Sequence, residues 1–482
     1  MNTIVFANQD FISAFSQKIG NPAVVVSTIV NPNKKYEFLV LDRKLCKLGE
    51  YRKLNYGNFP PLDSEIIDEY LQTESIFLKM SDRLGPSLSY QKRKDLYLKH
   101  LRFWHGFLTS IDYDAIVFEN IPHEGFDFIA YEISTKMSKK TFMFYQMPIR
   151  PKKTYLLQLI TNLYDHGIKV DQIRSKKSHT NFENLNPKFR GYLEVIESHF
   201  TSLNSFTRSK KNKKALFSCS FCKRFKSIVE LIKTVLESLR RLDKDDFIYL
   251  VKLRLGLGEK YLSKIQAKNF YQANVLNSAD LSDKYIYFPL HYQPELSTSP
   301  LAKHYVDLSL VCELLANATK SSGVKIYIRE HPRAFSSYGS RTKGFYQRMI
   351  EHQNVFFISG SINSFELIDK SFAVATINGS CGWEALLRKK NVLMFGPRFY
   401  SSMRGCYNVR TISDLREAIK SIGNTQDKIS DNDIFCFLKS LESETIEGFN
   451  YLKDESIATV SKQKSTENKI NILSSKINNL DE

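Results

Sequence analysis

The stretch Ala375–Gly396, ATINGSCGWEALLRKKNVLMFG, decides the fold of this chain. The apolar run Phe372–Ile377 leads into a glycine-containing turn, and the helical pattern Trp383–Arg388 follows the turn. A second apolar run, Asn391–Phe395, comes directly after that helix. Two short strands joined by a helix are typical of a parallel crossover unit, so this stretch predicts an α/β fold.

The same alternation extends towards both ends of the chain. The predicted strands are Tyr285–Leu290, Val324–Arg329 and Val355–Ile358 in the second half, and Ala23–Ile29, Phe38–Leu41, Ala115–Phe118 and Thr141–Tyr145 in the first half. We therefore predict an α/β protein with two doubly wound, Rossmann-like domains that face each other across a cleft. The predicted boundaries are 1–205 and 281–425 for the two domains, 206–280 for a basic helical insertion or linker, and 426–482 for a C-terminal helix and polar tail.

The composition is that of a globular protein with an anionic partner. Of the 482 residues, 42% are hydrophobic and 25% are charged, and the formal net charge is +18. Such an excess favours nucleic acid, an acidic membrane face or a phosphate-bearing substrate. The longest apolar runs fall far short of the ~20 residues that span a bilayer. The start carries no secretory signal pattern and the seven cysteines no disulfide framework, so we expect a cytoplasmic protein.

A basic segment, Arg208–Lys226, allows two interpretations. It can lie against an anionic inner membrane and deliver the protein to a lipid-linked acceptor, or it can be a solvated insertion without a special role. Nucleic-acid binding is a third function that the positive net charge of the chain could serve. The sequence has no helix-turn-helix, RNP or zinc-finger pattern, and aromatic residues do not alternate with the basic run. We therefore expect no nucleic-acid partner.

Parallel sheets bind ligands beyond the carboxyl ends of their strands, which directs attention to the residues there. After Phe372–Ile377 come Asn378, Gly379, Ser380, Gly382 and Glu384. The glycines allow close approach of the backbone, and the new helix offers free N–H groups and its positive end, which suits a phosphate. Glu384 can instead accept hydrogen bonds from sugar hydroxyls. The alternative is a strand-to-helix turn whose glycines serve packing.

His331 follows another predicted strand and is flanked by Arg329 and Arg333. An imidazole N–H with two guanidinium groups beside it can stabilise a departing phosphate. Pro332 fixes the direction of the chain at this point. The alternative is a loop histidine whose hydrogen bonds are satisfied within the protein.

Acidic residues follow the strand Ala115–Phe118 in the first half. Glu124 and Asp127 are candidates for a general base or a nucleophile, because burial near like charge raises a carboxyl pKa towards neutrality. The alternative is an acidic turn in which one of them caps the next helix.

Three motifs in fixed order carry a family resemblance: YFPLHYQPE at Tyr287–Glu295, YIREHPR at Tyr327–Arg333, and the stretch Ala375–Gly396. Together they resemble the bacterial capsule polysaccharide biosynthesis glycosyltransferases, which are related to the Kdo (3-deoxy-manno-octulosonic acid) transferases of capsule assembly. The similarity is strongest over Tyr285–Tyr400, and a weaker similarity is found at Ile121–Ser134. The basic segment and the tail match nothing in the family.

The resemblance implies a GT-B fold, with the nucleotide-sugar donor mainly on the second domain and a glycan or glycolipid acceptor on the first. Relatives use CMP-activated Kdo, so a CMP-linked acidic sugar is the implied donor. His331 would bind the donor phosphate, and Gln293, Glu295, Ser380 and Glu384 would complete the nucleotide site. Glu124 is the first candidate for the catalytic carboxylate and Asp127 the second.

The three motifs themselves contain no Asp-x-Asp triplet of the kind that carries a metal-bound nucleotide sugar, so we expect metal-independent chemistry without a cofactor. Two other functions stay open. A CDP-glycerol-type transferase of wall polymer synthesis has the same fold and also places histidines near the donor phosphate. A non-catalytic scaffold or a nucleic-acid-binding protein would not need His331 for its role.

Overall fold

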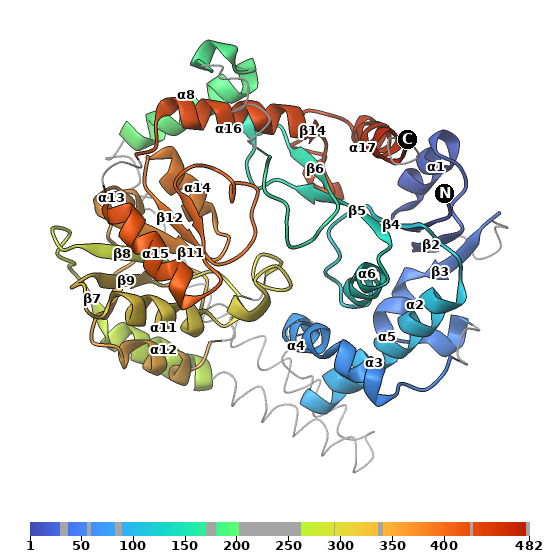
Figure 1. The fold of residues 1–482 in the computed structure, drawn as a ribbon, viewed down its shortest axis with the longest axis horizontal. Coiled ribbons are helices and arrows are strands. Elements are labelled where there is room, and N and C mark those ends of the chain that lie inside the picture. The colour runs from blue at the N-terminus through green and yellow to red at the C-terminus, as the bar shows by residue number, and fades with distance from the viewer. Residues whose placement is uncertain are drawn as a thin grey trace, which may run out of the picture.

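The computed structural model describes residues 1–28, 37–54, 59–81, 89–169, 180–201, 262–293, 295–335, 341–424 and 428–478. Figure 1 shows two lobes, one built from the blue-to-teal part of the chain and one from the yellow-to-orange part. Each lobe contains one seven-stranded sheet with helices packed against it. We refer to the lobes as the N-terminal and C-terminal domains.

The sheet of the N-terminal domain has the strand order β14-β6-β5-β4-β1-β2-β3. Its five strands from β3 to β5 pair in parallel, and β6 and β14 are added antiparallel at one edge. The strands are β1 (Thr3–Phe6), β2 (Val24–Ser27), β3 (Leu39–Asp42), β4 (Ala115–Phe118), β5 (Lys140–Gln146), β6 (Leu156–Ile160) and β14 (Ile446–Glu447). The order reverses between β1 and β4, which makes that position the topological switch point of this sheet.

The sheet of the C-terminal domain is parallel throughout and has the order β13-β12-β11-β8-β9-β10-β7. Its strands are β7 (Val275–Leu276), β8 (Tyr285–Pro289), β9 (Lys325–Arg329), β10 (Val355–Ile358), β11 (Ala373–Thr376), β12 (Val392–Met394) and β13 (Cys406–Asn408). The switch point of this sheet lies between β8 and β11. The strands after β7 have the order of a doubly wound nucleotide-binding fold.

Amphipathic helices cover both sheets (Figure 1). They are α1 (Gln9–Lys18), α2 (Arg43–Leu48), α3 (Ser64–Glu69), α4 (Leu71–Met80), α5 (Tyr90–Ser110), α6 (Phe126–Lys136), α8 (Pro187–Thr201), α11 (Leu308–Thr319), α12 (Lys343–Ile350), α13 (Ser364–Lys370), α14 (Ser380–Leu387), α15 (Ile412–Gly423), α16 (Asp431–Glu444) and α17 (Lys462–Asn478). None of the helices in the described ranges combines the length and the apolar character needed to cross a bilayer.

The predicted fold class is confirmed: the chain is an α/β protein with two Rossmann-like domains of the GT-B type. The sequence did not predict β1, β6, β7, β13 and β14. Two of these have only two residues and β13 has three, too few for a pattern of alternation to be visible. The basic segment Arg208–Lys226 lies outside the described residues, as does most of the predicted insertion.

The C-terminal segment returns to the N-terminal domain. Helix α16 spans the top of the molecule between the two lobes, and α17 lies beside α1 at the far side (Figure 1). Between these helices, β14 pairs with β6. Ile470, Leu473 and Ile477 of α17 are buried in one cluster with Phe11 and Phe15 of α1. The last part of the chain therefore completes the core of the first domain.

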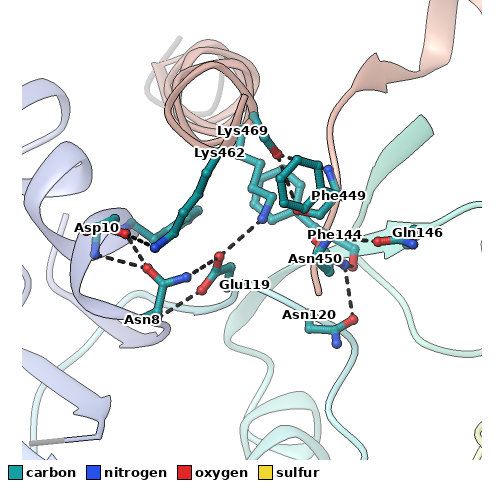
Figure 2. A network of polar contacts seen from close by, with 12 residues as sticks. Asn8, Asp10, Glu119, Asn120, Phe144, Gln146, Phe449, Asn450, Lys462 and Lys469 are labelled. Carbon is teal, nitrogen blue, oxygen red and sulfur yellow. Dashed lines mark hydrogen bonds and ion pairs between the residues drawn. The ribbon is translucent and has the colours of Figure 1, made fainter. Parts of the chain in front are cut away.

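A buried ion pair fixes α17 over the switch point of the N-terminal sheet (Figure 2). The Lys469 ammonium lies 3.1 Å from Glu119, which directly follows β4, and the two side chains are 2% and 13% exposed. Asn8, which lies two residues after β1 and caps α1, donates to the same carboxylate from its backbone N–H (2.9 Å) and its side-chain amide (2.8 Å). Lys469 therefore neutralises the carboxylate at the point where the strand order reverses.

Replacing Lys469 with Met leaves Glu119 buried without its cation, so we expect Lys469→Met to lower the free energy of unfolding by about 3–5 kcal/mol. Glu119→Gln in the same background removes the orphaned charge and should recover part of this loss. Urea unfolding of the two single variants, the double variant and the parent gives the coupling energy. A coupling near zero would show that the two side chains do not stabilise the domain as a pair.

Two buried histidines make the stability depend on pH. Burial lowers the pKa of His100 to about 3, with the Lys99 charge adding to the effect, and burial followed by the Arg398 charge lowers the pKa of His166 to about 3. Unfolding returns each imidazole to an ordinary value near 6.5. Between pH 6.5 and about 3 the unfolded chain therefore binds more protons than the folded one, and stability falls as the pH falls.

Each histidine should contribute about 2 kcal/mol of this loss between pH 7.5 and pH 5.0. His100→Gln keeps a partner for the Tyr51 hydroxyl, which lies 2.5 Å from Nδ1 of His100, and removes one proton-binding group. We expect urea unfolding of this variant to lose about 2 kcal/mol less on acidification than the parent. The difference between the two proteins in the free energy of unfolding at pH 7.5 gives the effect of the substitution itself, because the histidine is neutral in both states there. Equal losses in the two proteins would contradict the prediction.

Candidate functional site

A cavity of about 500 Å³ lies where the two domains meet, at the switch point of the C-terminal sheet. Residues after β8, β9, β11 and β12 line it from the C-terminal domain, and the end of β5 lines it from the N-terminal domain. The lining residues are Tyr145, Gln146, Pro289, Leu290, His291, Tyr292, Glu295, Leu296, Ser297, His331, Thr376, Asn378, Gly379, Ser380, Cys381 and Arg398.

The first turn of α14 forms one wall of the cavity. Gly379 is the N-cap of this helix and provides no side-chain cap, so the N-terminal N–H groups are left for another acceptor. Asn378 is fully buried, and its amide donates to the carbonyl of Ser297 at 2.6 Å. Among the described residues, the Oδ1 atom of Asn378 has no hydrogen-bond partner. This wall therefore offers backbone donors together with an unused amide oxygen.

His331 lies in the cavity wall after β9 in a defined tautomer. The backbone N–H of Arg333 donates to Nδ1 of His331 at 3.1 Å, which leaves the proton of the neutral ring on Nε2. Burial is the largest effect and lowers the pKa of His331; the Glu330 charge opposes it, and the Arg341 and Arg333 charges add to it. The ring lies 5.3 Å from that of Tyr292. His331 is therefore a neutral N–H donor at neutral pH.

A buried network of polar side chains behind the cavity wall fixes the positions of His331 and His291 relative to each other. Glu330 forms an ion pair with Arg341 and accepts a hydrogen bond from the Tyr346 hydroxyl at 2.5 Å. Arg341 also donates to the carbonyl of His291. The side chains of Glu330 and Arg341 are 3% and 4% exposed, so this pair is part of the interior. It links the ends of β8 and β9.

His291 is half-buried, and its ring accepts rather than donates on the side of α14. The N–H of Ile377 donates to Nε2 at 3.3 Å, and the Thr376 hydroxyl lies 3.1 Å from the same atom. Burial, followed by the Arg398 and Arg341 charges, lowers the pKa of His291 to about 3. A Cβ added to Gly379 would lie 3.1 Å from this ring, so glycine is required for the close approach.

Arg398 enters the cavity from the loop after β12. Its guanidinium carbon lies 5.8 Å from the centre of the Tyr145 ring, which belongs to the N-terminal domain. Its Nε atom is buried and has no hydrogen-bond partner in the described part of the chain. The neighbouring Phe399 carbonyl accepts from the N–H of Ile168 at 2.9 Å, so this loop bridges the two domains.

The C-terminal segment positions the wall contributed by the N-terminal domain. The amide of Gln146 donates to Asp454 at 2.8 Å, and its oxygen accepts from the backbone N–H of Asn450 at 2.7 Å. The Asn450 amide in turn donates to the carbonyl of Phe144 and to Asn120 (Figure 2). Gln146 therefore depends on residues more than 300 positions further along the chain.

Five of the residues predicted for the site line this cavity: Glu295, His331, Asn378, Gly379 and Ser380. Others lie behind it and make internal contacts. Arg329 donates to the carbonyls of Ile362 (3.1 Å) and Gly360 (2.7 Å), and the Gln293 amide donates to the carbonyl of Val306 at 2.6 Å.

The remaining predicted residues of the second domain surround the cavity without lining it. Arg333 is exposed and contributes its backbone N–H to His331. A Cβ on Gly382 would lie 2.5 Å from the Tyr400 hydroxyl, so this glycine serves close packing. Burial raises the pKa of Glu384, against a hydrogen bond from Ser380 and the Arg388 charge.

The two acidic candidates of the first domain, Glu124 and Asp127, do not line the cavity. Glu124 forms ion pairs with Arg43 (3.1 Å) and Lys47 (3.2 Å). Although its burial raises the pKa of Glu124, the two cations together lower it below its usual value. Burial raises the pKa of Asp127, which accepts three backbone N–H bonds at the start of α6. Their predicted catalytic roles stay predictions.

The cavity contains functional candidates that the sequence did not single out. His291 follows β8, Cys381 follows β11 and Arg398 follows β12, so their positions after strands, in or near the predicted motifs, could have identified them. Tyr145 and Gln146 had no such signal, because they enter the cavity only through the approach of the two domains. The same holds for Arg341, which supports the wall from a distant loop.

The contacts of Asp127 allow a direct test of its structural role. Its carboxylate accepts from the N–H groups of His123 (3.1 Å), Glu124 (2.7 Å) and Phe128 (2.7 Å). Asp127→Asn exchanges an acceptor oxygen for a donor and leaves buried N–H groups unpaired, so the variant should lose about 1–3 kcal/mol of stability. Thermal unfolding measures the loss, and the exposed Asp112→Asn is the control. An Asp127 variant as stable as the control would contradict this role.

The C-terminal domain is similar in sequence to proteins of a known family. Residues 303–430 match the family described as "Capsule polysaccharide biosynthesis protein". Protein FixF of Sinorhizobium fredii is 29% identical over 135 residues, which are 28% of this chain and 30% of that protein. The match thus spans less than a third of the length of this curated relative.

Among solved structures, Thermosulfurimonas dismutans KpsC, a beta Kdo 2,7 transferase, is similar over 82% of this chain and 95% of that one, with 12% identity and a TM-score of 0.30. A UDP-GlcNAc 2-epimerase of Methanocaldococcus jannaschii is similar over 92% and 99%, with 10% identity and a TM-score of 0.24.

The family match includes His331, the first turn of α14 and Arg398, and it therefore covers half of the lining residues that the C-terminal domain contributes to the cavity. The predicted resemblance to this family is confirmed, and two of the three ordered motifs, Tyr327–Arg333 and Ala375–Gly396, lie within the matched residues. Residues 303–430, about a quarter of the chain, are therefore similar to the capsule polysaccharide biosynthesis protein family.

Proposed function

We propose that the chain is a glycosyltransferase of capsule or surface polysaccharide biosynthesis that takes its sugar from a nucleotide-sugar donor. The observation that carries the proposal is the convergence of uncapped N–H groups of α14 and the Nε2–H of His331 on one interdomain cavity. Hydrogen-bond donors in such a place suit a phosphate. We further propose a CMP-linked acidic sugar, such as Kdo, as donor and a glycan or lipid-linked acceptor.

In this reaction the bond between the anomeric carbon and the phosphate oxygen breaks, and its electron pair stays on the phosphate. Negative charge therefore develops on the leaving nucleotide. His331 would donate from Nε2 to that phosphate, and the α14 N–H groups would bind its other oxygens. Because the Arg333 N–H fixes the imidazole, little reorganisation is needed as the charge grows. A nucleoside monophosphate leaving group is compatible with the metal-independent chemistry that we predict.

The acceptor hydroxyl must lose its proton as it attacks. Glu124 and Asp127 are the carboxylates predicted for this role, whereas Glu295 is the carboxylate on the cavity wall within the described residues. Tyr145 and Gln146 are the residues through which the N-terminal domain would face the acceptor. Binding of donor and acceptor between the domains, with the reacting atoms close together and correctly oriented, would supply a further part of the rate enhancement. Contact of the basic segment Arg208–Lys226 with an anionic membrane remains part of the proposal.

A thermal-shift screen of the purified chain against CMP, CDP, UDP, GDP and ADP, with magnesium or with a chelator, tests the proposal. A ligand that binds only the folded state raises the melting temperature once it exceeds its dissociation constant. We expect a shift with CMP in both conditions. His331→Ala should weaken CMP binding about 10- to 100-fold, because a hydrogen bond to a charged group is lost. The partly exposed His352→Ala, outside the cavity, should retain the full shift.

The alternatives give different results. A shift with CDP alone would favour a glycerophosphotransferase of the same fold. A shift that needs magnesium would contradict metal-independent binding. If no nucleotide changes the melting temperature, the donor proposal fails and a non-catalytic scaffold is favoured.

A further inference from the structure

Arg398 is the one side chain on the cavity wall that brings a guanidinium into the described site. No carboxylate in the described ranges forms an ion pair with it, and its buried Nε lacks a hydrogen-bond partner. The Arg398 side chain is half-buried, and its Nε is withdrawn from water. A charge withdrawn from water without a partner is costly, and proteins normally pair it. The structure thus contains a cation for which the described protein provides no counter-charge.

The surroundings of Arg398 are neutral rings rather than acids. Tyr145 faces the guanidinium from the N-terminal domain. His166 and His291 lie near enough for the Arg398 charge to favour their neutral forms. Burial raises the pKa of Tyr145, and the charge of Arg398 and a hydrogen bond from it oppose that rise. The other N–H groups of the guanidinium are available to a ligand.

The backbone around Arg398 holds the side chain in place. The Tyr400 hydroxyl donates to the carbonyl of Gly379, the N-cap of α14, and the Phe399 carbonyl accepts from Ile168. The Phe399 ring packs against Trp383 of α14, with the ring centres 5.3 Å apart. The loop is therefore tied to the proposed phosphate-binding turn on one side and to the N-terminal domain on the other.

We propose that Arg398 binds an anionic group of the donor, between the first turn of α14 and Tyr145 of the N-terminal domain. This inference rests on the proposed function and adds a binding residue to it. The chemical class of the group is an oxyanion: the phosphate of the nucleotide or a carboxylate of the transferred sugar. Arg398 would thereby make binding selective for charged donors.

Binding of cytidine, CMP and CMP-sialic acid to the parent and to Arg398→Gln tests the proposal by calorimetry. Cytidine lacks both anions, CMP adds the phosphate, and CMP-sialic acid adds a carboxylate. We expect Arg398→Gln to weaken the binding of at least one anionic ligand about 10- to 100-fold and to leave cytidine within about twofold. A loss that begins with CMP assigns Arg398 to the phosphate, and a loss seen only with CMP-sialic acid assigns it to the carboxylate.

Arg404→Gln is the matched control, since Arg404 lies six positions further along and outside the cavity, where it forms a 3.9 Å ion pair with Asp433. It should bind all three ligands as the parent does. The melting temperature without ligand gives a second readout. Because Arg398 has no counter-charge within the described residues, its replacement should not lower that temperature. A lowered temperature with unchanged affinity for both anionic ligands would overturn the proposal and assign a structural role.

The outcomes separate this inference from the proposed function. If the parent binds CMP or CMP-sialic acid and Arg398→Gln binds them equally well, only the role of Arg398 is overturned. If the parent binds neither CMP nor CMP-sialic acid, both the proposed donor and the inference are overturned. Arg398→Lys, which keeps the charge without the planar fork, should recover part of the lost affinity.

Discussion

Parallel pairing of the strands is the constraint on which the rest of this structure depends. It brings the residues after every parallel strand to one edge of the sheet, and the reversal of strand order opens a gap at that edge. In the C-terminal domain the gap lies between β8 and β11, with His291 on one side and the start of α14 on the other. This gap is the cavity, whose wall consists of short loops on rigid strands.

The N-terminal domain contains the same gap and fills it differently. Asn8 and Glu119 follow β1 and β4, and Lys469 of α17 occupies the position where a ligand would bind in an open sheet (Figure 2). The C-terminal segment thus closes one switch point while its residues Asn450 and Asp454 position Gln146 at the other. Within the part of the chain that the structure describes, the two similar sheets differ because a distant segment covers the switch point of the N-terminal one.

The sequence predicted the parts of this protein that depend on local pattern. Strand–helix alternation and the residues after strands identified the fold class, His331 and the first turn of α14. Long-range packing decided the rest, and single-sequence patterns do not contain it. Arg329 has the chemistry of a phosphate ligand, yet its guanidinium binds the carbonyls of Ile362 and Gly360. Lys469 reads as part of a solvated polar tail, yet it is 2% exposed against Glu119.

The net charge of +18 favours an anionic partner. The attraction of the cavity for an anion has a different source from this overall charge. Of its two histidines, His291 has a pKa of about 3 and burial lowers that of His331, so neither ring adds a charge at neutral pH. Helix N–H groups, one imidazole N–H and the Arg398 guanidinium remain. Hydrogen-bond donors at fixed positions in a partly enclosed site distinguish between ligands by their shape. Dissolved ions screen these donors less than they screen surface lysines. The charge of the whole chain and the chemistry of the site are therefore separate properties, and only the second one selects a ligand.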